Sequence, residues 1–259
     1  MVQRAIVRGM KAFSRCFEPF VSYGPVKKLS EVADEDDKAV LTDTELESQF
    51  IVDGKHVPAS RIGPESERTT YYSYKLRHVG YQFQCVVTHS GHCVHVSRGE
   101  RAGTHDLTVY MNNRMELLVG LCQMTGRNPI IMADKGYVSS NCPELITGSN
   151  ATFNKYRLLV ERYFGRMTSV FGIVSRAFPL TYEYFDDYIR TICFLTNVHV
   201  YCQKLREKDA EYNSATVFVW RRGGEEKGER HRASVKNSRS RQASVTTQIS
   251  KESAPDCPW

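Results

Sequence analysis

Four acidic residues stand at the edges of apolar segments, in settings that suit the binding of a divalent metal ion. They are Asp53 in FIVDG, Asp106 in GTHD, Asp134 in IIMADKGY and Glu161 in LLVERYFG. At such edges a rigid scaffold can direct a carboxylate into a cleft. Mg²⁺ takes a few carboxylate oxygens and fills its remaining positions with water and phosphate oxygens. These residue types therefore predict metal-assisted chemistry on phosphate esters, as in a nuclease.

The composition is that of an ordinary soluble globular protein. The chain has 259 residues, 41% of them hydrophobic and 25% charged, with a net charge of +6 that suits a polyanionic partner such as DNA. No apolar run approaches the roughly 20 residues of a membrane-spanning helix, so no membrane association is expected. The 8 cysteines include no CxxC pair, and the amino terminus lacks the apolar core of a secretory signal. We expect reduced thiols in an intracellular protein, nuclear or cytoplasmic, with the nucleus favoured.

Changes in composition divide the chain into three parts. Residues 1–47 form an acidic, irregular N-terminal segment of loop and short helix, residues 48–205 a folded domain, and residues 206–259 a basic disordered tail. In the tail, Ser234 and Ser244 follow basic residues, as basophilic kinases prefer, and phosphorylation there would reduce the positive charge. The same tail could serve in nuclear import, bind the DNA backbone, or simply be solvated.

The apolar patterns of residues 48–205 predict an α/β fold. QFIVDG predicts a short strand that ends in a turn, and strand-like segments flank a hairpin turn at Ser90-Gly91. A helix with Thr104 as its N-cap, a strand over 128–132 and two helices, from about residue 154 and over roughly 187–205, follow. This order of three antiparallel strands, a crossover helix and a fourth strand predicts an RNase-H-like mixed sheet flanked by helices.

Six motifs together resemble a known family. They are VDG (52–54), YYSYKLRHVGYQFQCVV (71–87), GERAGTHD (99–106), ADKGY (133–137), NKYRLLVERYFGRM (154–167) and FLTNVHV (194–200). In this order they resemble the DDE superfamily endonucleases of PIF/Harbinger-type transposases. The resemblance implies an RNase-H-like fold, dependence on Mg²⁺ or Mn²⁺, and DNA strand cleavage with strand transfer.

The resemblance also implies roles for individual residues. Asp53 matches the first catalytic aspartate, Asp134 the second and Glu161 the closing glutamate, whereas Asp106 matches a further candidate metal ligand. In a two-metal site Asp53 would lie between both ions, Asp134 would hold one and Glu161 the other. Four further residues are candidates for DNA contact: His105, Lys135, Arg162 and Arg166.

Each acidic residue has a simpler interpretation. Asp53 and Asp134 could be ordinary turn aspartates, and Asp106 could be a carboxylate favoured by the dipole at the start of a helix. Glu161 could pair with Arg157, which precedes it by four residues on the same helix face. His105 could be a solvated loop histidine, and the basic candidates could be outer helix residues.

The sequence suggests two other hypotheses. One is a zinc site formed by His89, His92, Cys93 and His95, but on a hairpin with alternating side chains these residues would point to opposite faces.

The other concerns partners. Only 52 residues precede Asp53, without a clear helix-turn-helix pattern, so a separate DNA-reading protein is an expected partner and the chain could form oligomers. The alternative to a nuclease is a catalytically idle, domesticated transposase domain that binds DNA or protein.

Overall fold

The structure, a computed structural model, describes residues 2–16, 26–63, 65–203 and 205. The predicted basic tail over 206–259, with Ser234 and Ser244, lies outside the described residues. Within them, no helix is both long enough and apolar enough to cross a membrane.

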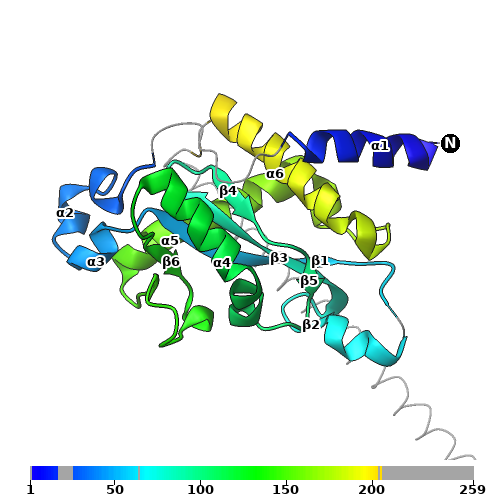
Figure 1. The fold of residues 1–259 in the computed structure, drawn as a ribbon, viewed down its shortest axis with the longest axis horizontal. Coiled ribbons are helices and arrows are strands. Elements are labelled where there is room, and N and C mark those ends of the chain that lie inside the picture. The colour runs from blue at the N-terminus through cyan, green and yellow to red at the C-terminus, as the bar shows by residue number, and fades with distance from the viewer. Residues whose placement is uncertain (1, 17–25, 64, 204, 206–259) are drawn as a thin grey trace, which may run out of the picture. The chain divides into compact units, whose positions relative to one another are not determined.

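A mixed seven-stranded sheet forms the centre of the described chain (Figure 1). The strand order is β2-β3-β1-β6-β7, and β4 and β5 also pair with β3. The chain runs antiparallel through β1, β3 and β4 and parallel through β1, β6 and β7. The strand bounds are β1 Phe50–Pro58, β2 Tyr72–Ser73, β3 His78–Thr88, β4 Cys93–Val96, β5 Glu100–Arg101, β6 Ile131–Ala133 and β7 Leu145–Thr147.

The predicted hairpin is confirmed between β3 and β4. Gly91 adopts a left-handed backbone with φ of 85°, a conformation that glycine reaches without a steric penalty from Cβ. The Thr88 carbonyl accepts from the Gly91 N–H at 2.9 Å, and the Thr88 N–H donates to the His92 carbonyl at 2.9 Å. The turn therefore fixes how β4 lies along β3.

Alternation along β1 divides the core between the two faces of the sheet. Phe50 and Val52 enter an apolar cluster with α4 (Asp106–Thr125), whereas Ile51 enters a larger cluster with α5 (Ala151–Val170) and α6 (Phe185–Cys202). Successive strand residues point to opposite faces, so a central strand covered by helices on both sides must be apolar at every position. This is the helix-flanked mixed α/β sheet that the sequence predicts.

The N-terminal segment is more ordered than predicted. Val2–Ser14 form the helix α1, which lies along α6 (Figure 1). Thr191 donates its hydroxyl to the Met10 carbonyl at 2.9 Å, and Ser14 donates to Asp187 at 2.8 Å. Two short helices follow, α2 (Glu35–Lys38) and α3 (Asp43–Leu46). The proposed division at residues 47 and 48 remains a prediction.

Several expected boundaries are wrong. Strand β1 does not end in a turn after Asp53 but continues to Pro58, because its second half pairs with β3 as far as Gly80. The N-cap of α4 is His105, not Thr104, since the His105 ring nitrogen accepts from the Leu107 N–H. The short strand β7 was not predicted.

Candidate metal and catalytic site

Asp53 on β1 and Asp134, which directly follows β6, occupy matching positions of a parallel strand pair. Phe50 pairs with Ile131 and Ile51 with Met132, so two further steps along each chain bring Asp53 opposite Asp134. Residues at matching positions point to the same face of a sheet. The Asp53 carboxylate accepts from the Gly54 N–H at 2.7 Å, and Asp134 accepts from the Lys135 N–H at the end of β6. The sheet register therefore gathers the first two predicted ligands.

Arg157 joins Asp53 to the third predicted ligand, Glu161. One guanidinium nitrogen lies 3.7 Å from an Asp53 oxygen, and another lies 2.8 Å from a Glu161 oxygen. Arg157 and Glu161 are one turn apart on α5, a spacing at which side chains meet. The simpler interpretation of Glu161 as a partner of Arg157 is therefore correct as a contact. It does not separate Glu161 from the site, because the same arginine also reaches Asp53.

Asp106 approaches from α4, on the other side of the sheet backbone. It is the first residue of α4, and its backbone carbonyl accepts from the Gln84 side chain at 2.7 Å. A Cβ placed on Gly54 would lie only 3.1 Å from an Asp106 oxygen, so the missing side chain of this glycine leaves room for the carboxylate. The other Asp106 oxygen lies 3.1 Å from the Lys75 ammonium.

The buried Tyr137 hydroxyl lies within the electrostatic influence of Asp53, Asp106 and Asp134. The residue is completely buried, and its hydroxyl has no hydrogen-bond partner among the described residues. Burial raises the pKa of Tyr137 well above its ordinary value, and the charges of Asp53, Asp106 and Asp134 raise it further. A buried hydroxyl without a partner is costly, so this position suits a water molecule or a ligand that would bond to it.

Asp53 is the most perturbed of the four carboxyl groups. Burial raises its pKa from 3.8 to about 6, and the charge of Glu161 adds to the increase. The Gly54 N–H, Arg157 and Lys75 act in the opposite direction. A carboxylate held in this way gains from the arrival of a further positive charge, as at a metal site.

The donor set fits Mg²⁺ or Mn²⁺, which prefer carboxylate oxygens. In the conformation described, however, no three of the four carboxylates bring oxygens within 4.8 Å of one another. Arg157 and Lys75 supply positive charge to the cluster instead. Binding of one ion by three of these carboxylates therefore requires their oxygens to move closer together.

The predicted DNA contacts fall into two groups. His105 is exposed at the start of α4, Lys135 is exposed next to Asp134, and Arg162 follows Glu161 on α5. Arg166, by contrast, donates to His199 at 2.9 Å and to the Gln203 carbonyl at 3.2 Å, so it is tied to α6 and its surroundings. It also lies roughly 14 Å along α5 from Arg157 at 1.5 Å per residue. These contacts direct the Arg166 guanidinium toward α6 and Gln203.

The zinc set suggested by the hairpin does not form among the described residues. His89 lies 3.3 Å from the Ser48 hydroxyl, whereas Cys93 points into the core toward two other cysteines. The His89 and Cys93 side chains point in different directions from the hairpin, as the sequence predicts, and this keeps them apart.

Sequence reasoning missed Lys75, Tyr137 and His56. Tyr137 follows Asp134 within the ADKGY motif, which was a usable signal. His56 lies two residues after Gly54 on the same strand face, and neither ring nitrogen has a partner in the described part of the chain. Burial lowers the pKa of His56, and the charge of Lys75 lowers it further. No pattern in the sequence marks Lys75 or His56.

One comparison with known proteins identifies the family. The model of the DDE superfamily endonucleases matches residues 52–197, which is 197 − 52 + 1 = 146 of 259 residues. No curated protein and no solved structure matches the chain. The match spans Asp53, Asp106, Asp134 and Glu161, and the sheet agrees with an RNase-H-like fold. Endonucleases of this kind act on DNA and usually use divalent metals. The chain therefore belongs to the DDE superfamily endonucleases.

Proposed function

We propose that the protein is a divalent-metal-dependent DNA endonuclease of the PIF/Harbinger type, which cleaves DNA strands and transfers them. Asp53, Asp134 and Glu161 form its catalytic set, and Asp106 assists as a further metal ligand. The observation that carries the proposal is the matched position of Asp53 on β1 and Asp134 just after the neighbouring β6, with Glu161 linked to Asp53 through Arg157.

The carboxylates of Asp53, Asp134 and Glu161 would hold Mg²⁺ or Mn²⁺, with Asp106 as a further ligand. When bound, a pair of such ions supplies activation of a water or 3′ hydroxyl and stabilisation of the leaving oxygen. Asp53 must be ionised to serve as a ligand, and its raised pKa of about 6 makes this condition sensitive to pH. The hydrogen bond from the Gly54 N–H orients its carboxylate.

Arg157 has two roles in this proposal. Without metal it neutralises Asp53 and Glu161. With DNA bound, the same guanidinium would contact the oxygens of a phosphate, a group that arginine binds with two parallel hydrogen bonds. Lys75 would act similarly after leaving Asp106. The two positively charged side chains would thus bind the carboxylates in the free protein and the DNA phosphates in the complex.

DNA is the proposed substrate, and the nucleus the proposed location. Lys135 and Arg162 adjoin the second and third carboxylates, and His105 is exposed beside Asp106. Contacts from such residues to phosphates would position DNA without selecting a sequence. A separate DNA-reading protein would then supply the choice of target.

The ion pairs also support a second candidate function. Arg157 and Lys75 give Asp53, Glu161 and Asp106 positively charged partners, so the cluster is compensated without any metal. A domesticated relative that binds DNA or protein without cutting would have the same arrangement.

Nicking of supercoiled plasmid with Mg²⁺ or Mn²⁺ separates the two functions. Asp134→Asn and Glu161→Gln should lose nicking, whereas Glu116→Gln should keep it, because Glu116 is an exposed glutamate on α4 outside the cluster. Equal activity in all four proteins would indicate a contaminating nuclease and contradict the proposal. A folded wild-type protein that does not nick DNA would favour the binding module.

A further inference from the structure

Three cysteines that lie far apart in the sequence meet in the core between the sheet and α6. Cys85 lies on β3, Cys93 on β4 and Cys193 on α6, and each is at most 1% exposed. Their sulfur atoms all lie within 4.8 Å of one another. No other group of three or more histidine, cysteine or acidic residues in the described chain is gathered so closely.

The sulfur spacing suits a metal ion. The Cys85 and Cys193 sulfurs are 3.9 Å apart, well beyond the roughly 2.05 Å of a disulfide bond. Zinc–thiolate bonds of about 2.3 Å place two sulfurs of a tetrahedral site about 3.8 Å apart. We propose that Cys85, Cys93 and Cys193 form a structural Zn²⁺ site, separate from the carboxylate cluster.

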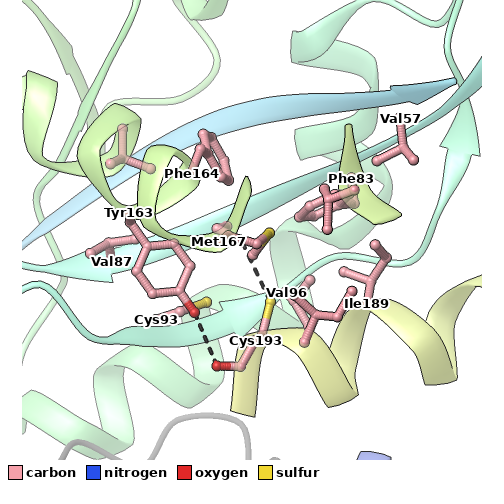
Figure 2. Close-up of a cluster of buried hydrophobic side chains, with 14 of the residues drawn as sticks. Val57, Phe83, Val87, Cys93, Val96, Tyr163, Phe164, Met167, Ile189 and Cys193 are labelled. Carbon is pink, nitrogen blue, oxygen red and sulfur yellow. Dashed lines mark hydrogen bonds between the residues drawn. The ribbon is translucent and has the colours of Figure 1, made fainter. Parts of the chain in front are cut away.

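An oxygen donor borders the three thiols. Figure 2 shows the Tyr163 ring between α5 and the strands, with its hydroxyl near Cys93 and Cys193. The hydroxyl donates to the Cys193 carbonyl at 3.1 Å and lies 3.2 Å from the Asn197 oxygen. Structural zinc sites are almost always four-coordinate, and the Tyr163 oxygen would complete the set.

Asn197 holds the backbone of Cys93 in position with two hydrogen bonds. Its side chain accepts from the Cys93 N–H at 2.9 Å and donates to the Cys93 carbonyl at 2.7 Å. The Asn197 amide therefore links β4, which carries Cys93, to α6, which carries Cys193. Such support from neighbouring hydrogen bonds holds metal ligands in position.

Ligand chemistry would keep the two metal sites distinct. Thiolates select Zn²⁺ over Mg²⁺, whereas carboxylates suit Mg²⁺ and Mn²⁺. Zinc would bind these three sulfurs as thiolates and release their protons. Three thiolates around Zn²⁺ leave a single net negative charge.

The site would stabilise the strand that faces Asp53. Cys85 pairs with Asp53 across β1 and β3, so zinc at the thiols would fasten β3 and β4 to α6 directly beside the first catalytic aspartate. The role is structural and does not depend on whether the carboxylates cleave DNA.

Zinc content and cobalt spectra test the site. The full chain is purified under reducing conditions without a metal-affinity column, and its zinc is measured by inductively coupled plasma mass spectrometry. We expect stoichiometric zinc in the wild type and in Cys142→Ala, which removes a buried cysteine of the other core cluster. Cys193→Ala should lose the zinc. Asp134→Asn should keep it, which distinguishes this site from the carboxylate cluster.

Cobalt substitution keeps the test decisive if Cys193→Ala does not fold. Co²⁺ added to the metal-depleted wild type should produce an intense thiolate-to-cobalt charge-transfer band in the near ultraviolet, and equimolar Zn²⁺ should abolish it. A folded, reduced wild type that contains no zinc and gives no such band would overturn the proposal. Equal zinc loss in Cys142→Ala and Cys193→Ala would do the same.

Discussion

Replacing Asp53 with asparagine should stabilise the metal-free protein at neutral pH. Burial raises the pKa of Asp53 from 3.8 to about 6, with a smaller contribution from Glu161. At 1.36 kcal/mol per pKa unit, this difference amounts to about 3 kcal/mol of unfolding free energy. The side chain is only 16% exposed, so solvent screens little of the effect. Asparagine has no charge to bury and can still accept from the Gly54 N–H.

The sign of the effect depends on pH. The folded state holds the proton more tightly than the unfolded chain, so the protonated form of Asp53 favours folding fully below about 3.8. That contribution is lost as the pH rises through about 6. The gain from Asp53→Asn should therefore be absent in acid, grow across this interval and reach about 3 kcal/mol at pH about 7.5.

Urea denaturation in buffers with a chelator, followed by circular dichroism, measures this gain. Asp134→Asn is the matched control, because Asp134 is exposed and asparagine can still accept from the Lys135 N–H; a change within about 0.5 kcal/mol is expected. A metal-free Asp53→Asn protein that is less stable than the wild type at neutral pH would refute the reasoning. A difference that does not change with pH would also refute it.

Three further predictions concern the same cluster. Arg157→Met should lower the unfolding free energy by roughly 1–3 kcal/mol, because Asp53 and Glu161 lose their counter-charge; urea curves should show Mg²⁺ restoring most of it, and no effect of Mg²⁺ would contradict this. Gly54→Ala should weaken Mn²⁺ binding in a calorimetric titration, since the new Cβ would lie 3.1 Å from an Asp106 oxygen; unchanged affinity would contradict it. Plasmid nicking should rise with pH through about 6 as Asp53 ionises, whereas a flat profile would argue against Asp53 as a ligand.

The elements that carry Asp134 and Glu161 are predictable from the sequence because short-range patterns mark them. Asp134 directly follows a buried strand, and Glu161 lies on a helix with a clear apolar stripe of Val160, Phe164 and Met167. For Asp53, the polar run after Val52 predicts a turn, and therefore the end of the strand. Pairing with β3 as far as Gly80 overrides that local signal. Such pairing depends on residues that are distant in the sequence.

Contacts between distant segments escape prediction for the same reason. The contact of Lys75 with Asp106 joins the turn after β2 to the start of α4, 31 positions along the chain. The meeting of Cys85 with Cys193 joins residues 108 positions apart, and neither has a neighbouring cysteine that would mark it. The Arg157 contact with Glu161 is local and was predicted as a pair. Its reach to Asp53 was not, because that contact depends on how α5 packs on the sheet.

The most direct test of the carboxylate site is the number of Mn²⁺ ions bound per chain, measured by electron paramagnetic resonance of free Mn²⁺. The wild type, Asp53→Asn, Asp134→Asn and the Glu116→Gln control should be compared at equal protein concentration. Both aspartate variants should lose Mn²⁺ binding together, while the control should match the wild type. Wild-type protein that binds no Mn²⁺, or binding that survives in both aspartate variants, would contradict the proposed carboxylate site.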